Sequence, residues 1–230
     1  MRRILYIFLG VFTLTACQQA ILPERTKGEC VLELDIACAD VPVVVSRAVD
    51  ADFALRILDG SGREYLYYPA GEVPRRIVLE PGLFALYAYT DNQETWHTAN
   101  DGKGEGCYYG GQLVSIEEDH TTRVSMSVPM TNYAVGLKLP EGFDDMFESY
   151  QCVLKSGSRE VTISEGELAY FSVADGGFSY ALSSTNIDGE SNALAPESYT
   201  DVQSGKMYLL NYHFGFEATR GVLEVEVERN

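Results

Sequence analysis

The sequence predicts an all-β protein made of two tandem β-sandwiches with one short crossover helix. Three observations lead to this prediction. Short runs rich in Tyr, Val, Ile and Phe follow one another along the chain, and Gly, Asp and Pro bound them as turn residues do. The same rhythm continues through the second half, and each half has roughly 100 residues, a common size for one sandwich.

Alternation is clearest at the start of the first half, where Leu32, Leu34 and Ile36 fall on one face of an extended segment. Residues 59–62 (Asp-Gly-Ser-Gly) are typical of a turn between two strands. The strands expected in the first half are 28–36, 53–58, 65–68, 77–79, 83–90, 113–116 and 122–128.

The second half begins with a strand over 133–139, and the crossover helix follows it. Phe143, Met146, Phe147 and Tyr150 are spaced i, i+3, i+4 and i+7, so a helix would carry them as one apolar stripe against a sheet edge. The later strands are expected at 151–154, 160–163, 169–173, 178–183, 206–214 and 221–228.

Weak sequence matches in a shared order indicate that the two halves arose by duplication. The matched pairs are 53–64 with 150–160, 81–86 with 176–181, and 120–128 with 205–214. We place the boundary near 130–133, which gives sandwiches over residues 28–131 and 132–230.

Residues 1–17 have the features of a targeting segment: two arginines, an apolar run over 4–14 that is too short to span a membrane, and small residues before Cys17. Leu-Thr-Ala-Cys over residues 14–17 is similar to a bacterial lipobox. This resemblance implies cleavage before Cys17 and acyl chains on its sulfur, with residues 18–27 as a tether. The alternative is an ordinary signal peptide followed by a chance cysteine.

The chain is acidic, with 17 Lys and Arg against 34 Asp and Glu and a formal net charge of −17. Removal of Arg2 and Arg3 with the targeting segment leaves 15 basic residues against 34 acidic ones, a net charge of −19. Such a surface repels phosphate backbones, so we expect no nucleic-acid partner.

No sequence pattern predicts catalysis, a metal site or a cofactor. His97, His120 and His213 are far apart, and none has a partner at metal-binding spacing. The sequence also lacks a Gly-x-Ser-x-Gly elbow and a calcium-loop pattern. We therefore expect a protein that is not an enzyme.

Four cysteines follow Cys17, and their state is open from sequence: Cys30, Cys38, Cys107 and Cys152. An exported chain forms disulfides, and four cysteines allow three pairings. Because some of them lie in apolar runs, buried free thiols are an equal alternative.

The connection over residues 91–111 is long for a β-protein and holds the only tryptophan. Trp96, His97, Tyr108 and Tyr109 would form a ligand-binding loop, in which aromatic faces stack on a sugar ring. The alternative, which we favour, is that the aromatic residues fold back and plug the end of the sandwich.

The order of several segments resembles a family of Bacteroidetes lipoproteins with a domain of unknown function and, more distantly, fimbrillin-like and fimbrial-anchor lipoproteins. The segments are the lipobox, 28–34, 52–62, 79–89, 109–114 and 124–139, followed by Phe143, Phe147 and Tyr150. The resemblance implies two transthyretin-like (Greek-key) sandwiches and a place in the cell envelope.

The fimbrial relatives also imply two details. Cleavage after Arg47 by an arginine-specific protease would remove the first strand and open a sheet edge to a partner strand. Residues 221–228 would be a donor strand. The alternatives, which we favour, are an ordinary loop arginine and a C-terminal edge strand whose glutamates discourage aggregation.

We therefore expect an outer-membrane-anchored lipoprotein with a structural, adhesive or fimbria-related role, whose partners are the membrane and a protein that adds a strand. Gln18 is not the aspartate associated with inner-membrane retention, which favours the outer membrane but leaves its two sides open. The alternative is a glycan-binding surface lipoprotein of a polysaccharide-uptake system.

Overall fold

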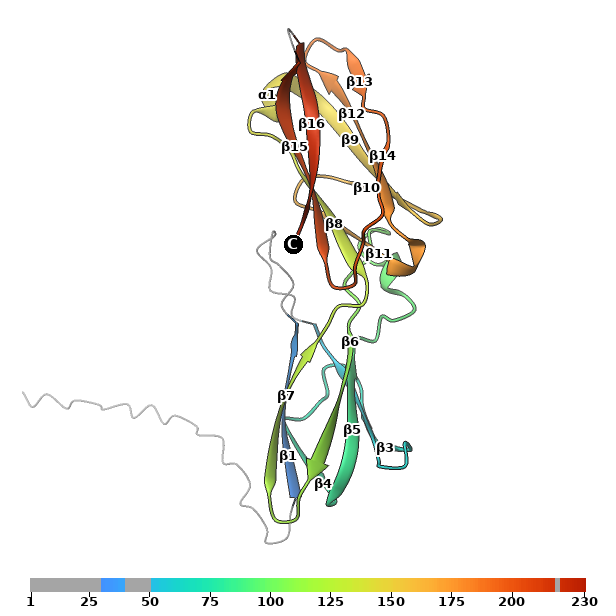
Figure 1. Cartoon of the computed structure of the whole chain (residues 1–230), viewed down its shortest axis with the longest axis vertical. Helices are drawn as coiled ribbons and strands as arrows, with labels where there is room; N and C mark the ends of the chain where they lie inside the picture. The colour runs from blue at the N-terminus through green and yellow to red at the C-terminus, as the bar shows by residue number, and fades with distance from the viewer. Residues whose placement is uncertain (1–29, 40–50, 218–219) are drawn as a thin grey trace, which may run out of the picture.

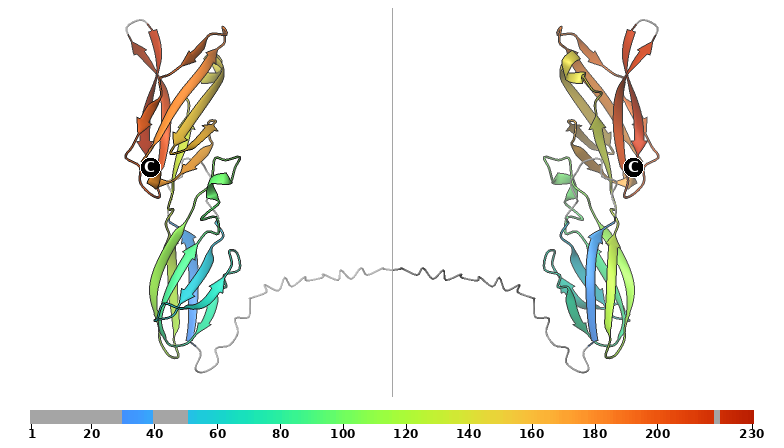
Figure 2. Two further views of the ribbon diagram at one scale, coloured as in Figure 1. Left: turned by 90° about the vertical axis from the view of Figure 1, so that its right-hand side faces the viewer. Right: turned by 90° about the vertical axis from the view of Figure 1, so that its left-hand side faces the viewer.

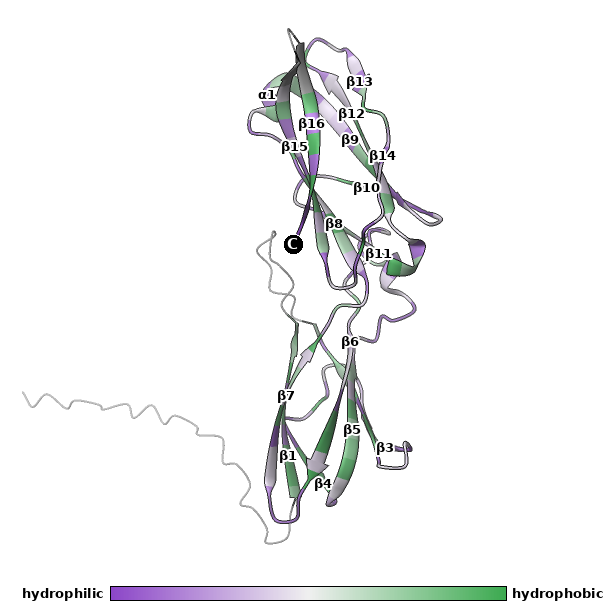
Figure 3. Ribbon diagram, viewed as in Figure 1, coloured by the Kyte–Doolittle hydropathy of each residue, from purple (hydrophilic) through white to green (hydrophobic). Residues whose placement is uncertain are grey.

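The computed structural model describes residues 30–39, 51–217 and 220–230, which fold into two β-sandwiches stacked end to end (Figures 1 and 2). This confirms the predicted all-β architecture with one short helix. Apolar residues concentrate in the strands and polar ones in the turns (Figure 3). Cys17, Arg47 and the proposed tether lie outside the described residues.

The N-terminal sandwich contains the first seven strands. They are β1 (Cys30–Cys38), β2 (Ala54–Leu58), β3 (Glu64–Tyr68), β4 (Arg76–Leu79), β5 (Gly82–Tyr89), β6 (Tyr109–Ile116) and β7 (Thr121–Val128). One sheet has the order β4-β1-β7, in which β1 is antiparallel to β4 and parallel to β7. The other, β3-β2-β5-β6, is antiparallel throughout. The core between them is mostly aliphatic, with Leu32, Leu55, Ile57 and Leu86 fully buried.

The C-terminal sandwich contains the remaining elements. They are β8 (Tyr133–Lys138), α1 (Phe143–Met146), β9 (Phe147–Ser156), β10 (Arg159–Ile163), β11 (Leu168–Phe171), β12 (Phe178–Asn186), β13 (Ser191–Ala193), β14 (Glu197–Tyr199), β15 (Met207–Glu217) and β16 (Arg220–Arg229), with a 3-10 turn at Val173–Asp175. The sheets are β11-β8-β15-β16 and β10-β9-β12-β13, and β14 also pairs with β12. Aromatic rings are frequent in this core, and the hydroxyl of buried Tyr133 donates to the carbonyl of Gly177 at 3.0 Å. Every buried side-chain nitrogen or oxygen in the described part of the chain has a hydrogen-bond partner.

The two sandwiches share one topology. β1, β4 and β7 correspond to β8, β11 and β15, with the same antiparallel and parallel pairings. β3-β2-β5-β6 likewise corresponds to β10-β9-β12-β13, and β16 is an addition. Each predicted sequence match falls on corresponding strands. With Arg56 matched to Val153, the registers make Tyr87 equivalent to Ala181 and hence buried Phe84 equivalent to buried Phe178, which differs by one residue from the match between 81–86 and 176–181.

Three local predictions need correction. The helix spans only Phe143–Met146, because the chain becomes extended at Phe147, which stacks on Phe143 with ring centroids 4.4 Å apart. Phe147 and Tyr150 are therefore strand residues. β6 begins at Tyr109, four residues earlier than expected, and the short strands β13 and β14 were not predicted.

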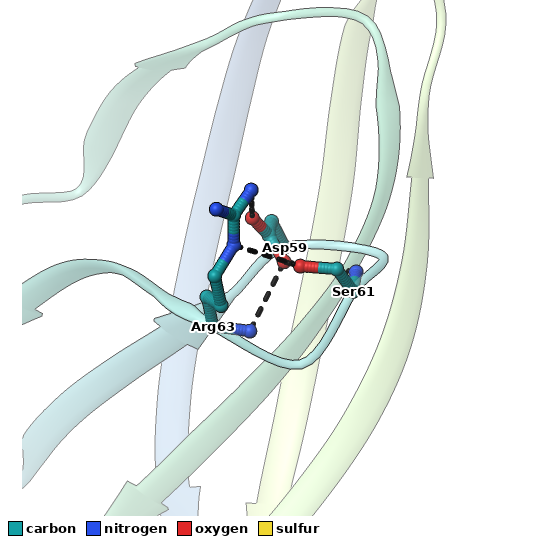
Figure 4. Close-up of polar contacts among 3 residues, drawn as sticks. All are labelled: Asp59, Ser61 and Arg63. Atoms are coloured by element: carbon teal, nitrogen blue, oxygen red, sulfur yellow. Dashed lines mark hydrogen bonds and ion pairs between the residues drawn. The ribbon is translucent and has the colours of Figure 1, made fainter.

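The β2–β3 turn is held by a carboxylate (Figure 4). Asp59 Oδ1 accepts hydrogen bonds from the backbone N–H of Ser61 at 2.8 Å and of Arg63 at 3.0 Å, and from the Ser61 hydroxyl at 2.6 Å. These bonds, led by the Ser61 hydroxyl, hold the pKa of Asp59 below its usual value. Arg63 lies 3.5 Å from Asp59 with its side chain 83% exposed.

Three cysteines, Cys30, Cys107 and Cys152, are buried free thiols. Burial raises the pKa of Cys152 to about 12. The sequence left disulfides and buried free thiols open, and these three cysteines match the free-thiol alternative.

Candidate functional site

The loop from Asp91 to Cys107 is compact and supplies its own hydrogen bonds. The Asn92 side-chain amide donates to Glu105 Oε1 at 2.9 Å and to the carbonyl of Gly106 at 3.0 Å. The Gln93 amide donates to the carbonyl of Tyr108 at 2.8 Å. These bonds draw the two ends of the loop together and project its middle, which contains the 3-10 turn Trp96–Thr98, toward the C-terminal sandwich (Figure 1).

Arg159, the first residue of β10, binds backbone carbonyls from both sandwiches. Its Nη2 donates to the carbonyl of His97 at 3.2 Å and to that of Gly102 at 2.6 Å, both in the loop. Its Nη1 donates to the carbonyl of Tyr170 in β11. One guanidinium therefore fixes the loop of the N-terminal sandwich to two strands of the C-terminal one.

Two aromatic rings flank the same guanidinium. The Arg159 Cζ atom lies 5.1 Å from the centroid of Trp96 and 5.1 Å from that of Phe171, both within cation–π range. Burial lowers the pKa of Arg159, while the charge of Asp175 opposes this shift. Since an arginine keeps its charge in proteins, the carbonyls and rings stabilise a fixed cation.

Two further contacts join the same surfaces. Lys103 Nζ lies 3.1 Å from Glu167 Oε1, and the backbone N–H of Tyr170 donates to the carbonyl of Lys103 at 2.8 Å. The backbone N–H of Ser164 also donates to Glu167, and this bond, with the lysine charge, lowers the pKa of the Glu167 carboxyl. We call the contacts of Arg159, Lys103 and Glu167 the clasp.

Residues 129–132 form the linker between β7 of the first sandwich and β8 of the second. Asn132 in this linker is 3% exposed and holds it in place through three hydrogen bonds. Its Oδ1 accepts from the backbone N–H of Cys107 at 3.1 Å, and its Nδ2 donates to the carbonyl of Glu105 at 2.9 Å. Its own carbonyl accepts from the N–H of Gly205 at 2.9 Å, just before β15. Both the linker and the clasp therefore restrict movement between the sandwiches.

The structure separates the four residues of the predicted ligand-binding loop. Trp96 and His97 lie at the clasp, where their rings meet edge to face at 5.8 Å. Tyr108 is 1% exposed and packs edge to face on Phe53 in the core, as the plug alternative describes. Tyr109 is 46% exposed and lies on the outer face of the sheet β3-β2-β5-β6. A sugar-binding role for the loop residues stays a prediction.

Tyr109 belongs to a group of tyrosines that sequence reasoning did not single out. The outer face of this sheet carries Tyr67, Tyr87, Tyr89 and Tyr109, which we call the tyrosine face. The ring centroid of Tyr109 lies 6.0 Å from that of Tyr87 and 6.3 Å from that of Tyr89. Arg56 lies 6.0 Å from the Tyr89 centroid. The signal in the sequence was the alternation of tyrosines at 87 and 89 between buried residues.

Within residues 30–39, 51–217 and 220–230, no group of three His, Cys, Asp or Glu side chains lies close enough to hold a metal ion. His213 and Glu224 form an exposed pair at 3.2 Å on neighbouring strands. In the same described segments, no helix has both the length and the apolar character needed to cross a membrane.

The fold places the chain among elongated β-proteins made of two sandwiches. Within that class, the chain belongs to the family described as a domain of unknown function, DUF4493, which matches residues 28–230. This confirms the resemblance seen in the sequence. A comparison with curated proteins finds no match.

Two solved structures have a similar fold. One is a fimbrial assembly protein from Parabacteroides distasonis ATCC 8503, with a TM-score of 0.53, 10% identity, and coverage of 88% of this chain and 99% of that one. The other is a proposed cell adhesion protein from Bacteroides uniformis ATCC 8492, with a TM-score of 0.51, 13% identity, and coverage of 87% and 98%. At these identities the likeness shows a shared fold.

Proposed function

We propose that the protein is a non-enzymatic lipoprotein, anchored in the outer membrane through Cys17, with a structural, adhesive or fimbria-related role. The observation that carries this proposal is the position of β1 in the elongated pair of sandwiches, which we call the rod. β1 runs parallel to β7, and Cys38 lies opposite Val128 beside the linker, so Cys30 lies at the far end of the N-terminal sandwich. A tether over residues 18–27 would hold the rod by one end and display the C-terminal sandwich outermost.

The comparisons support the fimbrial or adhesive part of this proposal. Two proteins of this fold are described as a fimbrial assembly protein and a proposed cell adhesion protein. The clasp also suits display, because a rod restrained at its joint holds its tip away from the membrane. We keep 28–131 and 132–230 as the two domains.

Lipidation is tested by metabolic labelling of the producing bacterium with an alkyne fatty acid. We expect the label on the purified chain and its loss in Cys17→Ala, whereas Cys38→Ala keeps it. Wild type should also fractionate with outer membranes, and protease shaving of intact cells then reports which side it faces. A label that survives Cys17→Ala would contradict the proposal.

Processing at Arg47 would affect the centre of a sheet. β1 lies between β4 and β7, so its removal would leave both neighbours without their partner and open a site for strand addition. Mass spectrometry of the native protein tests this: a chain that begins at residue 48 supports processing, and a chain intact from Cys17 contradicts it.

β16 bears on the donor-strand idea. It pairs with β15 of its own chain from Arg220 to Arg229, and Leu223, Val225 and Val227 pack against the core. It therefore occupies an edge of its own sheet. Cross-linking of the native chain to pilin-like subunits would support the fimbria-related role.

A glycan-binding surface lipoprotein of a polysaccharide-uptake system is the second candidate. The exposed rings of the tyrosine face favour it. Loss of polysaccharide binding in Trp96→Ala would place that binding at the loop. Incorporation of the native protein into a polymer would favour the first candidate.

A further inference from the structure

We propose that the tyrosine face binds neutral polysaccharides by stacking their sugar rings on exposed tyrosine rings. The surface lies on the N-terminal sandwich and is formed by β3, β5 and β6 beside Arg56 of β2. The inference deepens the second candidate function, glycan binding, by naming the surface and the ligand class, and its biological use rests on that candidate.

The rings of the tyrosine face are moderately tilted to one another. Tyr87 and Tyr109 are inclined to each other by 31°, and Tyr89 and Tyr109 by 32°. Gly111 lies opposite Tyr87 in the register, and a Cβ atom at Gly111 would lie 2.8 Å from the Tyr87 ring. The Tyr87 ring therefore lies over the glycine backbone, and Tyr109, with its ring centroid 6.0 Å away, extends the same surface.

Such a surface matches the chemistry of a sugar polymer. The C–H faces of sugar rings stack on aromatic faces, while phenol hydroxyls supply polar contacts at the edges. Tyr67 and Tyr109 keep 44% and 46% of their surface exposed, so their rings are accessible. The chain carries a net charge of −17, which repels anionic polymers and favours neutral ones.

The fold itself does not require these rings. Since Arg56 and Val153 are matched positions of the two sandwiches, the pairing registers align the tyrosine face with an equivalent face of the C-terminal sandwich. Its corresponding residues, in the order of Tyr67, Tyr87, Tyr89 and Tyr109, are Thr162, Ala181, Ser183 and Ala193. A sandwich of the same topology thus forms with small and hydroxyl side chains at all four positions.

The geometry also favours a sugar polymer over a protein partner. Aromatic anchors of protein interfaces insert into pockets and are ringed by contacts that exclude water. Here the rings lie on the open face of a sheet, where a flat ligand can cover several at once. Leu113 on the same face is 68% exposed and distinguishes the two cases, because an apolar interface would use it and ring stacking would not.

The test is affinity electrophoresis of the full chain, purified in detergent, in native gels that contain amylose, mannan, xyloglucan or mixed-linkage β-glucan. We expect at least one of these polymers to retard the wild type. Tyr109→Ala should raise the Kd for the polymer, obtained from the retardation at several polymer concentrations, about tenfold, which corresponds to ~1.4 kcal/mol of stacking. Tyr109→Phe keeps the ring and should retain most of the binding. Gly111→Ala keeps every tyrosine but displaces Tyr87, so it should also weaken binding.

Leu113→Ala and Ser183→Ala are the matched controls, one on the same face and one on the equivalent face of the other sandwich. Both should bind as wild type, and thermal melting should show every variant folded. The inference is overturned if none of the four polymers retards the wild type, or if Tyr109→Ala binds as wild type. It is also overturned if Leu113→Ala weakens binding as much as Tyr109→Ala. Lipidation at Cys17 does not enter this assay, so its failure is distinguishable from that of the proposed anchoring.

Discussion

The two sandwiches share a topology but place their aromatic rings differently. The buried core of the N-terminal sandwich has 3 aromatic residues among 18, and that of the C-terminal sandwich has 7 among 17. The N-terminal sandwich instead carries tyrosines on an outer sheet face. The comparison teaches that this topology accepts either kind of core, so rings on an outer face need another explanation than folding.

The β2–β3 and β9–β10 turns show a second difference. Each turn leads into an arginine followed by a glutamate, at Arg63 and at Arg159. Arg63 is exposed and bonds only within its own turn, to Asp59 and Ser61, in the contacts of the described residues. Arg159 binds the loop of the preceding sandwich. Of the two equivalent arginines, Arg159 therefore contributes to the joint between the sandwiches, whereas Arg63 stabilises only its own turn.

The largest effect should come from a ring inside the C-terminal core. Tyr133→Ala removes a fully buried ring that contacts Phe171, Phe178 and Tyr208. We expect the free energy of unfolding to fall by about 3–5 kcal/mol, as for other large aromatic core residues. Denaturant titration followed by circular dichroism measures it.

Tyr109→Ala is the counterpart on the tyrosine face. It removes a ring of the same size from the surface, and we expect a loss of less than ~1 kcal/mol, the range of a cross-strand pair. Equal losses in the two variants would break the comparison, since the outer ring would then contribute to stability as much as the inner one.

The clasp should show an intermediate effect. Arg159→Met keeps the packing of the side chain but removes the donors to three carbonyls, so we expect a local loss of about 1–3 kcal/mol. The measurement is hydrogen exchange of the Tyr170 amide, which bonds to Lys103 across the joint. Its exchange should become faster.

Arg63→Met is the matched control because it removes the same charge from the equivalent turn. The Tyr170 amide should then exchange as in wild type. If both variants speed its exchange alike, a general charge effect rather than the clasp is responsible, and the difference between the two turns loses its meaning.

Sequence reasoning predicted the strands well because alternation and turn residues act locally. Leu32, Leu34 and Ile36 sit in one strand and point toward the core, as their spacing indicates. The apolar spacing from Phe143 to Tyr150 misled because it fits a helix, whereas pairing of β9 with β12 makes Phe147 and Tyr150 extended. β13 and β14 have three residues each and form only as partners of β12.

The joint was not predictable from the sequence. Arg159 and Trp96 are distant along the chain, and they meet only because the sandwiches stack end to end. Sequence reasoning found the loop notable because of its length and its tryptophan, but neither feature reveals what the loop contacts. The tyrosine face has the same origin: register across β3, β5 and β6 brings together rings that belong to separate segments.

The smallest effect, and the sharpest for the comparison, concerns pH. Asp59 and Glu167 both have a lowered pKa because each accepts hydrogen bonds, Asp59 chiefly from the Ser61 hydroxyl and Glu167 chiefly from the Ser164 backbone N–H. Only Glu167 also reaches the other sandwich, through Lys103. A lowered folded pKa means that Glu167 stabilises the fold above the unfolded value of ~4.3 and loses this contribution as the pH falls through the folded value. Glu167→Gln should therefore cost a few tenths of a kcal/mol at pH 7, as exposed pairs do. That cost should vanish as the pH falls below the lowered folded pKa of Glu167.

Hydrogen exchange of the Tyr170 amide in wild type and Glu167→Gln, compared from pH 7 to about pH 3, measures this difference, with exposed Glu148→Gln as control. Since intrinsic exchange rates change with pH, the quantity to compare is the ratio between variant and wild type at each pH. A ratio above one that falls to one in acid places Glu167 in the joint. A ratio that stays constant with pH would mean that its charge acts only within its own turn, as that of Asp59 does, and the two carboxylates would then be equivalent.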